Sequence, residues 1–173
     1  MKNRILGRTG LSVSEIGLGS EAFVNQDDAF AQELINAALK AGVNYFDLYN
    51  PEPYIRSSFG KAMQGRRDKF ILQAHLCSAW IDGQYKRTRD MGEVKAAFAD
   101  LMDRLDTSYI DVGMVHYVDE QKDFDEVFSG EVIRFAQEQK ALGKIRHLGM
   151  STHNPRIAIP VSYTHLRAHE TVL

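Results

Sequence analysis

Cysteine, net charge and long apolar runs are all scarce in this sequence, and each shortage excludes a class of protein. The single cysteine among 173 residues, Cys77, excludes an internal disulfide framework and an iron–sulfur ligand cluster within this chain, and it suits a reducing compartment. A formal charge of -2 gives no bulk attraction to nucleic acid or to an anionic membrane. We therefore expect neither as a partner.

Segments that would carry the chain to or through a membrane are missing as well. No apolar run approaches the roughly 20 residues of a membrane span. The basic residues Lys2 and Arg4 are not followed by the apolar stretch of a signal peptide. We expect a cytoplasmic protein. The remaining composition, 44% hydrophobic and 25% charged, is typical of a globular domain and excludes a disordered or collagen-like chain.

What the chain does contain is an alternation of short apolar strands and amphipathic helices. Thr9 and Gly10 predict the turn of an N-terminal β-hairpin. The strands are predicted over 15–20, 43–47, 70–75, 109–116 and 145–151, and the helices over 27–41, 55–63, 92–105 and 125–142. Such alternation indicates βαβ units and a parallel sheet whose faces are covered by helices.

The ends of the predicted strands distinguish between two ways of arranging that sheet. The glycines after the first strand do not form the fingerprint of an open, dinucleotide-binding sheet. Side chains capable of chemistry instead end successive strands: Asp47, His75, His116 and Ser151. Because barrel sites are assembled from the carboxyl ends of several strands, this pattern favours a (β/α)8 barrel.

The length of the chain conflicts with a complete barrel. A closed barrel takes about 250 residues and eight strands, and roughly five strands are predicted here. We therefore expect an incomplete (β/α)8 TIM barrel of about five strand–helix units, preceded by the hairpin. Residues 1–160 would form the N-terminal portion of this barrel.

The tail does not continue the pattern. Asn154 and Pro155 begin a plausible further helix, which Pro160 is predicted to break. The string VSYTHLRAHET, residues 161–171, resembles the translation of a transposase-type sequencing-library adapter. We interpret residues 161–173 as a non-native tail; a frayed native terminus is the alternative.

Four stretches together resemble the aldo-keto reductase superfamily: LGRTGLSVSEIGLGS, GVNYFDLYNPEPYIRSSFGKAM, SYIDVGMVHYVDE and GKIRHLGMSTHN. They cover nearly everything from Arg4 to Asn154. The resemblance implies a barrel plugged by the hairpin and an NADPH-dependent reduction of a small-molecule carbonyl substrate, with NADH as the other candidate cofactor. It also implies a catalytic tetrad of Asp, Tyr, Lys and His, in which the tyrosine donates a proton to the carbonyl oxygen.

Only part of that tetrad is present. Asp47 matches the aspartate and His116 matches the histidine, whereas Glu52 stands where the tyrosine belongs and His75 where the lysine belongs. Since a phenol with its usual pKa near 10 needs a neighbouring cation to act as an acid at neutral pH, the change alters the chemistry. Glu52 and His75 could replace the missing pair, with protonated His75 as the acid beside the Asp47 carboxylate. Tyr49 lies nearby but out of register.

The cofactor-side residues implied by the resemblance are Ser151, Thr152, Gly19 and Ser20. Ser151 matches the serine that contacts the nicotinamide carboxamide, although it could equally cap the next helix. Thr152 stands where asparagine is common, and Gly19 could serve only a turn. The long segment LCSAWIDGQYKRTRD resembles a bacterial subgroup that carries an iron–sulfur, ferredoxin-like segment at its C-terminus, which would lie beyond this chain. The basic and aromatic residues of that segment indicate a solvated loop or a substrate cover.

Two other classes of function remain open. Asp47, His75, His116 and His153 could supply ligands to zinc or iron in a metal-dependent hydrolase, although their spacing matches no short metal motif. Alternatively, the chain is a non-catalytic half-barrel remnant, because the later strands that bear the family's adenosine and phosphate contacts are absent. On its own we expect it to be inactive. The sequence gives no indication of oligomeric state.

Overall fold

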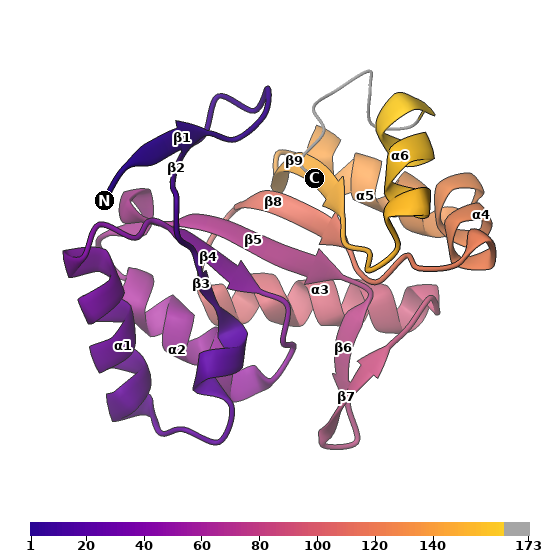
Figure 1. Ribbon diagram of the computed structural model, residues 1–173. Helices are drawn as coiled ribbons and strands as arrows, with labels where there is room; N and C mark the ends of the chain where they lie inside the picture. Colours follow the sequence, from indigo (N-terminus) through magenta and orange to yellow (C-terminus); the bar gives the residue numbers. More distant parts are fainter. Residues whose placement is uncertain (165–173) are drawn as a thin grey trace.

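A computed structural model describes residues 1–164, and its centre is a five-stranded parallel sheet (Figure 1). The strands are β3 (Leu18–Gly19), β4 (Tyr45–Leu48), β5 (Ile71–Leu76), β8 (Ile110–Val115) and β9 (Ile145–Met150). They lie side by side in chain order, without the reversal that defines a doubly wound sheet. This order is that of a partial (β/α)8 barrel, as predicted from the sequence.

Helices connect consecutive strands of this sheet, and a further helix follows the last strand. They are α1 (Asp28–Lys40), α2 (Pro53–Met63), α3 (Met91–Leu105), α4 (Gln121–Ser129), α5 (Glu131–Ala141) and α6 (Pro155–Thr164), with short 3-10 turns η1 (Ser20–Phe23) and η2 (Arg67–Lys69). The first three lie along the same face of the sheet (Figure 1). Within residues 1–164, none of these helices has the length and apolarity needed to cross a bilayer.

Local chemistry explains where these elements begin and end. The Asp27 carboxylate accepts a hydrogen bond from the Phe30 amide and so caps α1. Gly42, with φ +88°, turns the chain after that helix. Pro53 occupies the first turn of α2, where its missing N–H costs nothing. The core between sheet and helices includes an aromatic group in which the Phe59 ring contacts Phe23 and Phe46.

The predicted N-terminal hairpin is present and covers the other face of the sheet. Strands β1 (Asn3–Ile5) and β2 (Ser12–Ser14) pair antiparallel, and the Thr9 hydroxyl donates to the Leu6 carbonyl within the turn. Leu6 and Leu11 pack against Val112 and Met114 of β8, which are almost fully buried. The hairpin therefore acts as a plug over the middle of the sheet.

Two helix predictions are wrong. The single helix predicted over 125–142 is divided into α4 and α5 at Gly130, whose backbone is extended at φ −96° and ψ −162°. A Cβ at Gly130 would lie only 2.2 Å from the Glu126 carbonyl oxygen, so the break depends on glycine. The break predicted at Pro160 is absent, since α6 continues to Thr164. A proline removes one backbone hydrogen bond, which a helix can tolerate at a cost of about 3 kcal/mol. Residues 165–173 of the predicted tail lie outside the described part.

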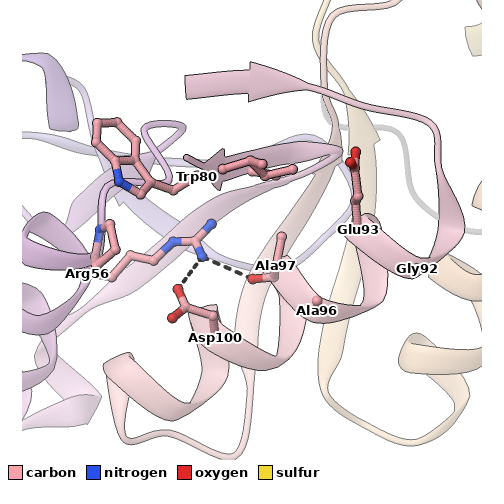
Figure 2. Close-up of a pocket in the computed structure, with 10 residues that line it drawn as sticks. Arg56, Trp80, Gly92, Glu93, Ala96, Ala97 and Asp100 are labelled. Atoms are coloured by element: carbon pink, nitrogen blue, oxygen red, sulfur yellow. Dashed lines mark hydrogen bonds and ion pairs between the residues drawn. The ribbon is translucent and has the colours of Figure 1, made fainter. Parts of the chain in front are cut away.

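The segment after β5 is a second β-hairpin and not a loop. Strands β6 (Ser78–Ile81) and β7 (Gln84–Arg87) pair antiparallel and extend from the carboxyl end of β5 (Figure 1). Asp82 and Gly83, with φ +51° and +77°, form its two-residue turn. On its outer side a cavity of about 450 Å³ lies against α2 and α3 (Figure 2). There Arg56 donates to the Ala97 carbonyl and pairs with Asp100 at 2.8 Å, which ties α2 to α3.

The close packing of α2 on α3 yields a test of the fold. A Cβ at Gly60 would lie 2.1 Å from the Arg104 carbonyl oxygen, so Gly60→Ala must push the two helices apart. We expect a loss of about 1–3 kcal/mol in unfolding free energy, measured by urea denaturation. Gly19→Ala is the matched control, because its Cβ would meet nothing within 4 Å. An unchanged urea midpoint for Gly60→Ala would contradict this packing.

Candidate active site

The parallel register places the predicted site residues at one edge of the sheet. Asp47 lies in β4, His75 in β5, His116 directly after β8, and Ser151 directly after β9. In this register Leu48 pairs with Ala74, His75 with Met114, and Val115 with Met150. The carboxyl ends of the strands are thus level, and their side chains converge.

Four side chains form a continuous chain of contacts there. Nε2 of His75 lies 3.0 Å from Oδ1 of Asp47, and Nδ1 of His75 lies 2.8 Å from Nδ1 of His116. Nε2 of His116 lies 2.8 Å from the hydroxyl oxygen of Tyr85. The Asp47–His75 contact is at ion-pair distance without the alignment of a hydrogen bond. Both of its atoms are buried and have no hydrogen-bond partner among the described residues.

Burial controls the charge of this chain. Desolvation first, and the neighbouring charge of His75 second, lower the pKa of His116 to about 3. His116 is therefore neutral near pH 7 and carries one ring proton, on either Nδ1 or Nε2. Burial also raises the pKa of the Tyr85 phenol, against the opposing effect of Arg87, so Tyr85 is neutral too.

The four side chains line a cavity of about 620 Å³. Its walls include two further tyrosines, Tyr49 and Tyr117, as well as Ser151 and Thr152. The Tyr49 ring stacks on His116 with centroids 6.3 Å apart, and its hydroxyl donates to the Glu21 carboxylate. Such a pocket, mostly apolar with a few convergent polar groups, is typical of a small-molecule site.

Backbone strain marks the same region. Tyr117, which directly follows His116, has φ +60°, and Cys77, two residues after His75, has φ +69°. Neither is a glycine, and side chains larger than glycine rarely adopt this left-handed conformation. Strained residues of this kind concentrate at functional sites, where the surrounding structure holds them in place.

The predicted cofactor-side residues differ in their distance from the chain of contacts. Ser151 accepts a hydrogen bond from the Tyr117 amide and lies 3.3 Å from Nδ1 of His116, whereas the Thr152 hydroxyl donates to Asp119. Gly19 pairs with Asp47 across the β3–β4 ladder. Ser20 is buried, and its hydroxyl accepts from the Asn50 amide.

Glu52 is not brought into this chain of contacts. It directly precedes α2, its side chain makes no capping hydrogen bond, and it does not line the 620 Å³ cavity. The role predicted for it, as part of a replacement for the tyrosine–lysine pair, receives no geometric support. Sequence reasoning did not single out Tyr85, which lies in the segment interpreted as a solvated loop or a substrate cover. The signal was present, because Asp82-Gly83 between two polar–apolar segments is a strong indication of a hairpin.

The metal-site alternative has no ligand set in the described part of the chain. Within residues 1–164, no group of three or more histidine, cysteine, aspartate or glutamate residues is arranged to hold a metal ion. His153, proposed as a fourth ligand, is instead bound to Asp119, with its Nδ1 3.0 Å from a carboxylate oxygen. Its side chain is 74% exposed and borders the cavity that the two buried histidines also line.

Comparison with known proteins identifies the class to which this fold and site belong. The model of the aldo/keto reductase family matches residues 15–165, and the chain belongs to this family. It is 30% identical over 161 residues to the uncharacterized oxidoreductase YqkF of Bacillus subtilis, covering 91% of this chain and 51% of that protein. It is also 30% identical over 158 residues to L-galactose dehydrogenase of Arabidopsis thaliana, covering 86% and 47%.

Solved structures show the same likeness. The holo form of the aldo-keto reductase AKR11C1 from Bacillus halodurans superposes with a TM-score of 0.77 at 29% identity. The match covers 93% of this chain and 53% of that protein. The chain thus spans about half the length of the curated relatives that it matches.

The buried His116 predicts how stability depends on pH. Its pKa is about 3 in the folded chain and near 6.5 when unperturbed, so the unfolded state takes up the proton first as the pH falls. The stabilisation is complete above about pH 6.5 and is lost progressively below it. Between about pH 6.5 and 4.5 we expect a loss of roughly 2–3 kcal/mol in the free energy of unfolding from this one group.

Urea denaturation at the two pH values checks this expectation. His116→Gln should show a smaller decrease than the wild type, because glutamine does not titrate. His153→Gln is the control and should retain the wild-type dependence, since that histidine is largely exposed. Equal decreases in the wild type and His116→Gln would show that His116 is not held neutral by burial.

Proposed function

We propose that this chain forms the first half of an NADPH-dependent reductase of small-molecule carbonyl compounds, with NADH as the alternative cofactor. One observation carries the proposal. Asp47, His75 and His116 converge in a pocket at the carboxyl ends of parallel strands, where enzymes of this architecture place their chemistry. Membership of the aldo/keto reductase family supports the same reaction class.

The residues that line the pocket suit a nicotinamide. Tyr49 and Tyr117 offer flat aromatic walls, and the Ser151 hydroxyl can still donate its proton to a carboxamide oxygen while accepting from the Tyr117 amide. When bound, the cofactor supplies a hydride to the carbonyl carbon. Gly19 and Ser20 lie behind the pocket and would shape the β3 end of the site; they do not line the cavity themselves.

The chain must also deliver a proton to the carbonyl oxygen. Asp47 is an anion placed 3.0 Å from His75, which favours a protonated imidazole there and makes this pair the proton reservoir. The neutral His116 can donate a hydrogen bond and orient the substrate. In this assignment His75 takes over the cationic role of the missing lysine, and Glu52 has no part.

The half-barrel alone is proposed to be inactive. β3 and β9 are the two edges of the sheet, each without a further strand in the described residues. Closing a barrel requires about three more strands beside them. Residues 1–160 would be the native portion, and 161–173 the non-native tail. A C-terminal iron–sulfur segment, if the parent protein has one, would lie outside this chain, and the site proposed here does not use it.

A direct test starts from the source DNA. The reading frame across the codons for Asn154 to Leu173 is sequenced after amplification without transposase adapters, and the protein is expressed from the frame obtained. We expect further βα units and NADPH consumption with a panel of aldehydes and ketones. A frame that ends after Leu173 would contradict the proposal that this chain is the first half of a longer barrel, and no NADPH binding or turnover would contradict the reductase proposal.

Substitution of Asp47 then tests the proposed proton reservoir. Asp47→Asn removes the anion beside His75 while keeping the shape of the side chain, so kcat/KM should fall about 100-fold or more. Asp68→Asn is the control, because Asp68 is exposed and pairs with the neighbouring Lys69 at 3.7 Å. An Asp47→Asn enzyme as active as this control would remove Asp47 from the mechanism.

A further inference from the structure

The β6–β7 hairpin contributes one side chain to the site. This side chain, Tyr85, does not come from the end of a strand of the parallel sheet. Tyr85 lies on β7, opposite Trp80 in the ladder, and its hydroxyl reaches Nε2 of His116 at 2.8 Å. The Tyr85 ring meets the His116 ring edge to face, with centroids 6.0 Å apart. The residue is 44% exposed, so its hydroxyl lies between the buried histidine and the open side of the cavity.

Several contacts fix the hairpin in this position. At its base the Ser78 hydroxyl donates to the Tyr49 carbonyl, and the Thr88 amide donates to the Cys77 carbonyl. Lys86 pairs with Glu93 of α3 at 2.7 Å, and Arg89 donates to the His116 carbonyl at 2.9 Å. The hairpin also borders the 450 Å³ cavity that is lined by the Arg56–Asp100 pair (Figure 2). Tyr85 is therefore carried on a braced element.

We propose that Tyr85 is the proton donor to the substrate carbonyl and that His116 and His75 form a relay which returns the proton to it. This inference rests on the proposed reductase function and names the group that completes it. Tyr85 would take the part that the family assigns to a tyrosine after β4, a position that Glu52 occupies here.

The relay is balanced in protons. Before the reaction His75 carries protons on both ring nitrogens, its Nδ1–H donates to Nδ1 of His116, and the Nε2–H of His116 donates to the Tyr85 oxygen. As the carbonyl carbon gains a hydride, its oxygen takes the Tyr85 proton. Tyr85 takes the proton of His116 Nε2, and His116 Nδ1 takes that of His75. His75 ends neutral with Nε2–H toward Asp47, and solvent restores its proton.

The surroundings of the two histidines suit such a relay. The titratable and charged groups that face them are Asp47 from β4, Tyr49 after β4, Tyr117 after β8, and Tyr85, Arg87 and Arg89 from the hairpin and the turn after it. Burial raises the pKa of the Tyr85 phenol, which makes Tyr85 a weak acid alone. Reprotonation by His116 in the same step removes the need to form a free phenolate.

Tyr49 is the competing donor, and its contacts exclude it from the relay. It lines the same cavity, but its hydroxyl donates to the Glu21 carboxylate. Its ring faces His116 without a hydrogen bond between the two, with an interplanar angle of 25°. A proton lost from Tyr49 could not be replaced from His75 along any hydrogen bond of the described residues.

The relay makes a prediction that does not require the cofactor. When His75 loses its second proton, the proton of His116 must move from Nε2 to Nδ1. Nitrogen-15 NMR of the 173-residue chain, with histidine labelled, reports which ring nitrogen of each histidine is protonated across a pH titration. We expect His116 to switch tautomer while remaining neutral. A single His116 tautomer throughout the titration overturns the relay.

Kinetics of the protein from the full reading frame test Tyr85 itself. Tyr85→Phe keeps the ring and removes the hydroxyl, so kcat should fall about 100-fold or more with KM for the cofactor nearly unchanged. Tyr109→Phe is the matched control. Tyr109 directly precedes β8, at the end of the sheet away from the site, and its ring contacts Arg67 and Arg146. It should retain wild-type kcat.

The outcomes separate this inference from the proposed function. A Tyr85→Phe enzyme with the kcat of the Tyr109→Phe control overturns Tyr85 as the donor, whatever the NMR titration shows. Absence of NADPH-dependent reduction in the wild type counts against the proposed function alone, since the tautomer switch is measured without cofactor. Loss of kcat in Tyr85→Phe together with the His116 switch supports the complete relay.

Discussion

The level alignment of β4, β5, β8 and β9 is the constraint on which the site depends. Because the strands run parallel and in register, the side chains at their carboxyl ends converge without any long loop to guide them. The other end of the sheet is fixed by a buried carboxylate, Asp111 of β8. It binds Arg67 at 2.8 Å, Arg146 at 3.1 Å and the Leu72 amide at 3.0 Å, and so links β5, β8 and β9. A slip of one strand would leave these partners unpaired and separate His75 from His116.

Burial then decides what the converged side chains can do. At this depth desolvation and the neighbouring charge of His75 both oppose protonation of His116, so that ring stays neutral near pH 7. The result is a polar row that starts at Asp47 and His75 and has two neutral members, His116 and Tyr85, at its other end. Tyr85 is the last residue of the row and lies on the exposed strand β7. The row therefore begins in the core and ends at the cavity.

Patterns that repeat over many residues were predictable from the sequence, whereas contacts that depend on one residue were not. The sheet, its helices and the convergence of Asp47, His75 and His116 follow from apolar periodicity and from polar residues at strand ends. The division of α4 from α5 depends on the backbone conformation of Gly130 alone. The periodicity of apolar residues gives no information on the conformation of a single residue. The Asp82-Gly83 sequence indicates the turn of the β6–β7 hairpin, but the polar residues of β7 resemble those of a loop.

Glu52 illustrates the difference between a match by sequence position and a place in the pocket. Matching the chain to its family residue by residue assumes that each role stays at its place in the sequence, and at that place the chain offers a carboxylate outside the pocket. Proton donation, however, requires a hydroxyl at a place in space. The insertion after β5 supplies one from 33 residues further along the chain, on a hairpin that is held by Glu93 and by the His116 carbonyl. The relay that we propose for Tyr85 would complete in three dimensions a tetrad that is incomplete in the alignment.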